Sequence, residues 1–194
     1  MEDKRYYDTL AAAYLRGKAL KTGKPVFEDK VLLKKELTEL EEKEREEILE
    51  IGRGVFLFPF LEEFPWVQVI SVDILPHRVA FLRDISDGGI ARLQAVESDI
   101  CSQPFSENFV DVVTMLEVLE HIPKVEEAVK AAVKMARKYV VVSVPSKEDD
   151  NPEHIHLLTK QVLTDLFQEA GCTRLHFDGV NGHLILIASI ERGG

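Results

Sequence analysis

The sequence has little of several features that would define its class. It contains two cysteines, Cys101 and Cys172, in segments predicted to be different elements, and it has no CxxC pattern. Disulfide frameworks and structural zinc sites need more cysteines at closer spacing, so two reduced thiols are expected. No apolar run approaches the roughly 20 residues of a membrane helix, and the charged start MEDKRYYD lacks the apolar core of a signal peptide. These absences predict a cytoplasmic protein without a membrane segment.

Positive charge is also scarce. The chain has 24 Lys and Arg against 34 Asp and Glu, which gives a formal net charge of −10. Such a surface repels a phosphate backbone on average, so nucleic acid is an unfavoured partner. The 194 residues, 45% hydrophobic and 30% charged, suffice for one globular domain with its own core.

The chain divides into two parts by pattern. Residues 1–45 are predicted to form an N-terminal helical arm that acts as a lid, and residues 46–194 a single compact domain. In the domain, short apolar runs alternate with helical patterns, which is typical of a parallel sheet covered on both faces. The predicted strands are 48–51, 67–74, 91–100, 110–115, 139–145, 173–177 and 183–190, and the predicted helices are 56–63, 76–84, 125–137 and 159–170.

The turn residues 178–182 predict an antiparallel hairpin between the last two strands. The predicted fold is therefore α/β, a Rossmann-like three-layer sandwich around a seven-stranded, mostly parallel sheet whose last strand is antiparallel.

Candidate ligand-binding residues follow the predicted strands, because open parallel sheets bind ligands beyond the carboxyl ends of their strands. Gly52 and Gly54 follow the first strand, Asp73 lies at the end of the second, and Asp99 lies at the end of the third. A carboxylate about 20 residues after a glycine turn can accept bonds from both ribose hydroxyls. One strand further, a carboxylate can accept from an adenine amino group. The alternatives are an ordinary loop aspartate at 73 and a helix or turn cap at 99.

The fourth predicted strand runs into two carboxylates and a histidine, in FVDVVTMLEVLEHIP at 109–123. On a helical turn Glu117 and Glu120 share a face, and His121 follows. His154 and His156 come later, in PEHIHLL. Carboxylates and imidazoles can bind a divalent metal, or they can order the loop and face the substrate. The favoured prediction is that no metal is bound. If one were bound, Glu117, Glu120 and His121 would be its candidate ligands.

These segments together resemble a known family. EILEIGRG, SVDI, ESDI, FVDVVTMLEVLEHIP and VVVSVPS are similar to class I S-adenosylmethionine-dependent methyltransferases. The branch they resemble most is that of the ubiquinone and menaquinone biosynthesis enzymes (methyltransferase type 11). The resemblance covers residues 48 to the C-terminus. It implies S-adenosyl-L-methionine as the cofactor and a methyl acceptor that is expected to be a small molecule.

The resemblance also implies individual roles. The methionine portion would lie against Glu50, Gly52 and Gly54, and the ribose and adenine against Asp73, Ile74, Asp99 and Ile100. The other side of the cofactor would be lined by Met115, Leu116 and Glu117. One of Tyr6, Tyr7 and Tyr14 in the arm would close the lid. In the EVLEH segment itself, His121 is the candidate for a catalytic general base near the transferred methyl group. Some relatives hold a metal through E-x-x-E-H, whereas EVLEH also occurs in metal-free relatives.

One glycine of the family pattern is missing. The pattern is E-x-G-x-G-x-G, and Phe56 occupies the third glycine position here, with Arg53 as a cation beside the site of a sulfonium. A glycine permits close approach of backbone and ligand. The ring of Phe56 either packs into the core or fills the methionine site. The leading hypothesis is a methyltransferase, and the alternative is a non-catalytic methyltransferase-like binding module. A nicotinamide-dependent oxidoreductase is less favoured because of EVLEHIP and the closing hairpin.

Overall fold

The structure is a computed structural model that describes residues 57, 60–61, 67–102, 105–180 and 182–191. The expected arm 1–45, the strand at 48–51 and Phe56 lie outside the described residues. By their internal contacts the described residues divide into two compact units, the first ending at Ser98 and the second beginning at Asp99. Each unit is described by itself.

The first unit is a strand–helix–strand repeat. It consists of β1 (Val69–Asp73), α4 (Pro76–Asp87) and β2 (Leu93–Glu97), and the two strands pair in parallel. Pro76 is the first helical residue, where a missing N–H leaves no hydrogen bond unmade. The core of this unit is formed by Leu57, Leu61, Val79, Leu82, Ile85, Leu93 and Ala95. All three predicted elements are therefore confirmed.

Two element ends in the first unit differ from the prediction. Helix α4 continues past residue 84 because Ile85 is buried in the core, and it ends before Gly88 and Gly89, the latter with φ 125°. Strand β2 ends at Glu97 instead of residue 100, because the carboxylate of Asp99 accepts a hydrogen bond from the Cys101 amide and begins a 3-10 turn, η2 (Ile100–Ser102).

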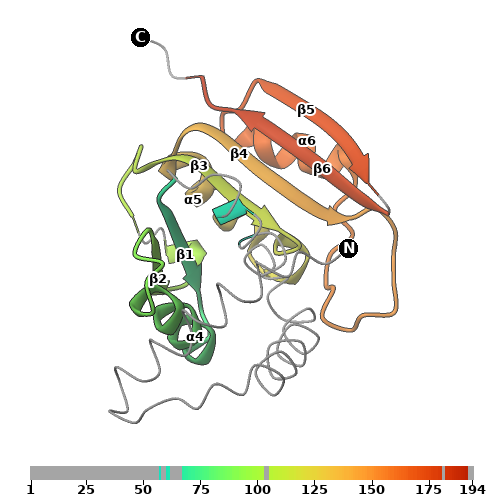
Figure 1. Ribbon diagram of the computed structural model, residues 1–194. Helices are drawn as coiled ribbons and strands as arrows, with labels where there is room; N and C mark the ends of the chain where they lie inside the picture. The colour runs from blue at the N-terminus through green and yellow to red at the C-terminus, as the bar shows by residue number, and fades with distance from the viewer. Residues whose placement is uncertain (1–56, 58–59, 62–66, 103–104, 181, 192–194) are drawn as a thin grey trace. The chain divides into compact units, whose positions relative to one another are not determined.

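The second unit is a four-stranded mixed sheet in the order β3-β4-β6-β5 (Figure 1). Its strands are β3 (Val110–Leu116), β4 (Ala136–Pro145), β5 (Arg174–Val180) and β6 (His183–Ser189). Strands β3 and β4 are parallel, and β6 is antiparallel to both β4 and β5. The predicted antiparallel last strand is thus confirmed. Its place between β4 and β5 puts its first residue, His183, opposite Pro145 at the end of β4.

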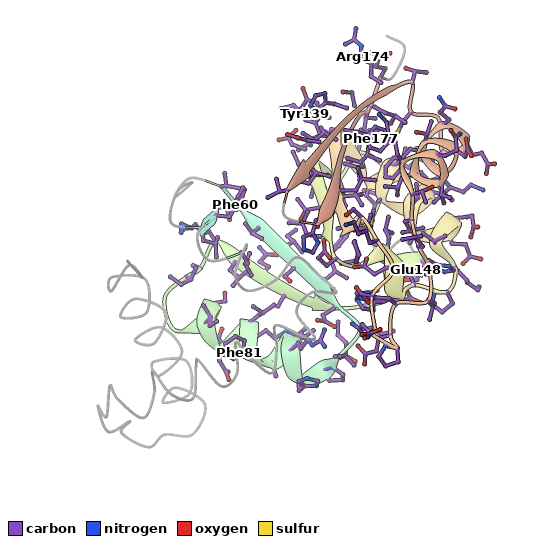
Figure 2. All side chains as sticks on the ribbon, turned by 90° about the vertical axis from the view of Figure 1, so that its right-hand side faces the viewer. Phe60, Phe81, Tyr139, Glu148, Arg174 and Phe177 are labelled. Carbon is purple, nitrogen blue, oxygen red and sulfur yellow. The ribbon has the colours of Figure 1, made fainter. Side chains whose placement is uncertain are left out.

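Two helices pack on this sheet, α5 (Val125–Met135) and α6 (Lys160–Glu169). Helix α5 has Glu126 and Glu127 in its first turn and Lys134 in its last, which suits the helix dipole. Helix α6 begins after Thr159, whose hydroxyl accepts from the Val162 amide at 3.3 Å. Their buried faces form one core with β4 and β6, which includes Ala128, Val129, Val140, Val142, Leu163, Phe167, Leu186 and Ala188. Phe177 of β5, labelled in Figure 2, packs against the same core.

The six described strands lie in a two-stranded and a four-stranded sheet. The alternation of strands and helices is Rossmann-like, while the seven-stranded sheet stays a prediction. Cys101 is half-buried and Cys172 is buried, and both are free thiols as expected. Within the described part of the chain, no helix is long and apolar enough to cross a membrane.

Gly171 provides a test of how α6 ends. Its φ is +98°, and a Cβ placed there would meet nothing within 4 Å, so a side chain would cost backbone strain alone. We expect Gly171→Ala to lower the free energy of unfolding by about 1–2 kcal/mol, measured by urea denaturation. Gly179→Ala is the control, because that Cβ makes an ordinary 3.5 Å contact with the His183 carbonyl oxygen. Equal losses in the two variants would contradict the role of the left-handed residue.

Candidate functional site

Asp73 ends β1 and connects it to α4. Its Oδ1 accepts from the Leu75 amide at 2.7 Å, and its Oδ2 lies 3.4 Å from Nη1 of the buried Arg78. Burial raises the pKa of this carboxyl group, while the Leu75 hydrogen bond and the Arg78 charge oppose the rise. The next residue, Ile74, leaves 59% of its surface exposed. The end of β1 thus has a carboxylate fixed by Leu75 and Arg78, followed by the exposed apolar side chain of Ile74.

Asp99 and Ile100 begin the second unit. Asp99 is exposed, and its Oδ1 accepts from the Cys101 amide at 2.8 Å, which is the capping role that the sequence left open. Ile100 is partly buried against the core of this unit. A carboxylate has two oxygens with about four acceptor directions, so capping does not prevent it from accepting from a ligand as well.

Met115, Leu116 and Glu117 follow one another at the end of β3. Met115 is buried in the core, and Leu116 is half-buried. Glu117 has φ 55°, a left-handed conformation that costs a non-glycine residue roughly 1–2 kcal/mol. Two bonds to Ser143 hold it there, because its amide donates to the Ser143 carbonyl at 2.9 Å and its Oε1 accepts from Ser143 Oγ at 2.6 Å.

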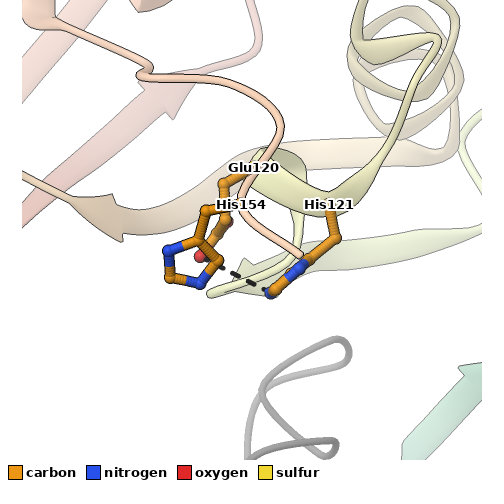
Figure 3. Close-up of side chains that lie close together, drawn as sticks. All are labelled: Glu120, His121 and His154. Atoms are coloured by element: carbon orange, nitrogen blue, oxygen red, sulfur yellow. Dashed lines mark ion pairs between the residues drawn. The ribbon is translucent and has the colours of Figure 1, made fainter. Parts of the chain in front are cut away.

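Glu120, His121 and His154 form a second cluster, in which one potential ligand atom of each lies within 4.8 Å of the others (Figure 3). Glu120 is fully buried, and neither carboxylate oxygen has a hydrogen-bond partner among the described residues. Burial raises its pKa to about 8; its own backbone amide opposes the rise, and the charges of Glu117 and Asp149 add to it. His121 Nε2 lies 4.0 Å from Glu120 Oε1.

The two imidazoles of this cluster are oriented by bonds at their other ring nitrogen. His121 Nδ1 lies 3.0 Å from the Glu153 carbonyl oxygen, and His154 Nδ1 lies 2.8 Å from Asp149 Oδ2. Such outer partners fix the tautomer of a histidine and leave Nε2 with its lone pair. One carboxylate and two imidazoles in this state could hold a divalent transition metal.

The residues brought together differ from those expected. The sequence placed Glu117 with Glu120 and His121, but the carboxylate of Glu117 is held by Ser143, and His154 completes the group instead. His154 reaches it because its loop is bonded to the turn η3 (Leu119–His121) and the residue after it. The Ile155 amide donates to the Glu120 carbonyl oxygen, and His156 Nε2 lies 3.0 Å from the Ile122 carbonyl oxygen. In the sequence, the segment PEHIHLL indicated a further histidine, but not that His154 would lie beside Glu120 and His121.

This cluster leads to a metal-binding prediction. We expect Zn²⁺ to raise the unfolding temperature, by an amount equivalent to about 2.7 kcal/mol when the metal is at 100 times its dissociation constant. Glu120→Gln and His154→Ala should each remove the rise, because each deletes one ligand. His176→Ala is the matched control, since His176 is exposed on β5. A rise that persists in His154→Ala would contradict this site.

Glu50, Gly52, Gly54 and Tyr14 lie outside the described residues, so their expected roles stay predictions. Asp73 and Ile74 belong to the first unit, and the other described candidates belong to the second.

Comparison with known proteins gives the class. Residues 49–142 match the family model of a methyltransferase domain. No protein of curated function matches the sequence significantly. The fold is similar to that of the [4+2]-cyclase SpnF, with a TM-score of 0.62 and 15% identity over 70% of this chain and 72% of that one. It is also similar to a SAM-dependent methyltransferase from Aquifex aeolicus, with a TM-score of 0.57 and 17% identity over 69% and 75%.

A further SAM-dependent methyltransferase, from Archaeoglobus fulgidus, has a TM-score of 0.55 and 14% identity over 78% of this chain and 93% of that one. The structural likenesses at these identities concern the fold alone. The family match over residues 49–142 indicates a class I S-adenosylmethionine-dependent methyltransferase domain in that part of the chain, with S-adenosyl-L-methionine as its cofactor. The assignment to the ubiquinone-like branch stays a prediction.

Proposed function

We propose that this protein transfers a methyl group from S-adenosyl-L-methionine to a small-molecule acceptor. The observation that carries the proposal is the family match over residues 49–142, because that stretch contains the glycine turn, Asp73, Asp99 and the whole EVLEH segment. The acidic balance of the chain supports it as well, since the cofactor carries a sulfonium and an ammonium group.

The cofactor roles proposed for the described residues are those that the family resemblance implies. Asp73 would bind the ribose hydroxyls, and the exposed Ile74 would flank the adenine ring. Asp99 would accept from the adenine amino group, with Ile100 beside the ring. Met115, Leu116 and Glu117 would line the other side of the cofactor. Glu50, Gly52 and Gly54 would hold the methionine portion, and Tyr14 in the arm would cover it.

The fold itself does not fix the reaction, because a [4+2]-cyclase shares it. The test must therefore detect methyl transfer as well as binding. We expect purified protein to bind S-adenosylhomocysteine in calorimetric titration and to transfer radiolabelled methyl from the cofactor to one member of a panel of hydroxyl and amine acceptors. Cofactor binding without any transfer would favour the non-catalytic binding module.

Phe56 decides between the enzyme and a closed pocket. If its ring packs into the core, wild type binds the cofactor and Phe56→Gly gains nothing; if the ring fills the methionine site, Phe56→Gly binds more tightly. If neither protein binds at about 1 mM cofactor, the proposed function is excluded. A dissociation constant of about 1 mM corresponds to a binding free energy of only about 4 kcal/mol.

A further inference from the structure

His183 lies at the edge of the four-stranded sheet where β3 and β4 end. It is the first residue of β6 and pairs with Pro145, the last residue of β4. Because β6 runs antiparallel to β4, its beginning shares an edge of the sheet with the carboxyl ends of β3 and β4. Ligands of open α/β sheets bind beyond that edge. As a strand residue His183 had no expected role, and the strand order gives it one.

His183 is directed at a fixed carboxylate. Its Nδ1 lies 3.0 Å from Glu117 Oε1, the same oxygen that accepts from Ser143 Oγ. The contact has the length of a hydrogen bond, but Nδ1 makes no hydrogen bond of good direction with any described residue. An ionised carboxylate can only accept. A hydrogen bond at this contact therefore requires the proton on Nδ1, which would leave the lone pair on Nε2.

His183 and His121 differ in access. The side chain of His183 is 36% exposed, whereas that of His121 is 6% exposed and its Nε2 is buried. The imidazole of His183 is therefore more open to solvent than that of His121, although its Nδ1 is buried. The residues paired with His183 on β4 and β5, Pro145 and Val180, are uncharged, and the charged side chain that the structure places against its ring is that of Glu117.

The backbone of Glu117 is consistent with a functional position. Its left-handed conformation is held by two bonds to Ser143, and non-glycine residues in such conformations concentrate at active sites.

We propose that His183 is the general base of the methyl transfer and that Glu117 is the residue that positions it; this rests on the proposed function. The acceptor's O–H or N–H gives its proton to Nε2 of His183, and the acceptor's electron pair forms a bond to the methyl carbon. The carbon–sulfur bond of the cofactor breaks, and its electron pair stays on sulfur as the thioether of S-adenosylhomocysteine. Glu117 stabilises the imidazolium until the proton leaves to solvent, as a carboxylate does in a nucleophile–base–orienter set.

The first test needs no acceptor. Two-bond ¹H–¹⁵N NMR spectra report the tautomer of each histidine, and the loss of one signal in His183→Asn assigns His183. At about pH 8.5, two units above the ordinary histidine pKa of about 6.5, we expect the Nδ1–H tautomer in wild type. Glu117→Gln should change the proportion of the Nδ1–H tautomer, because an amide side chain can either accept from Nδ1–H or donate to an unprotonated Nδ1. An Nε2–H tautomer in wild type would overturn the proposal whether or not the protein is a methyltransferase.

The second test separates a base from a structural residue. The probes are phenol, which is protonated at this pH, and 4-nitrophenol, which is largely ionised and needs no base. We expect His183→Asn to lower methylation of phenol by about 10²–10⁴-fold, to spare 4-nitrophenol and to leave S-adenosylhomocysteine affinity unchanged. His176→Asn on β5 is the control. Equal losses with both probes would assign His183 a structural role, while a wild type that binds no cofactor would refute the proposed function. If the wild type methylates neither phenol nor 4-nitrophenol, the His183 tautomer measured in the first test decides whether the proposal stands.

Discussion

Replacing Asp73 with asparagine should weaken S-adenosylhomocysteine binding by about 10²–10⁴-fold. A carboxylate that accepts from two ribose hydroxyls makes two charge-assisted hydrogen bonds, each worth about 1.5–3 kcal/mol, and each 1.4 kcal/mol is tenfold in affinity. Asparagine keeps an acceptor for the Leu75 amide, which bonds to Oδ1 of Asp73 at 2.7 Å. It cannot accept from both hydroxyls, because one of its two polar atoms is an NH₂ donor.

The measurement is calorimetric titration of both proteins with the same cofactor. The substitution also removes the charge opposite the buried Arg78, so thermal unfolding must show that the variant is folded at the titration temperature. Asp87→Asn, at an exposed position in the last turn of α4, is the matched control and should bind as wild type does. Unchanged affinity in Asp73→Asn would refute the ribose assignment.

Replacing Phe167 with alanine should lower the free energy of unfolding by about 3–5 kcal/mol. Phe167 of α6 has no exposed surface and belongs to the core that α5 and α6 form with β4 and β6. Removing its ring deletes apolar burial and leaves a cavity, because close-packed neighbours relax only in part. Urea denaturation followed by circular dichroism measures the loss.

Phe109→Ala is the control for that substitution. Phe109 is exposed at the start of β3 and stacks on Phe105 with ring centroids 4.5 Å apart. Its loss should cost about 0.5–1.5 kcal/mol, the worth of an aromatic pair. Equal costs at the two positions would contradict the burial of Phe167.

The strands and helices of the described region were predictable because their signals are local. Short continuous apolar runs, and helical runs between glycine or proline breaks, located all nine elements expected between residues 67 and 190. The ends were less accurate where a tertiary or capping bond intervenes. Helix α5 stops at Met135 instead of residue 137, because Ala136 already pairs with Val110 of β3.

The candidate site was predictable to the same extent. The end of β1 at Asp73 and the end of β3 before Glu117 follow from the strand pattern. The direction of each side chain does not follow from it. Glu117 was expected to share a helical face with Glu120, but it has a left-handed backbone, and its carboxylate accepts from Ser143 Oγ. His154 enters the cluster only because its loop bonds to the backbone of Glu120 and Ile122.

The sequence by itself determined the class of this protein. Its strand–helix alternation, its strand-end carboxylates and the EVLEH segment all depend on residues close together in the chain. Only the tertiary structure decided which distant residues meet, because the order of strands depends on backbone pairing between segments far apart in sequence. The insertion of β6 between β4 and β5 brings His183 to the edge where Glu117 lies, and no local pattern encodes that neighbour.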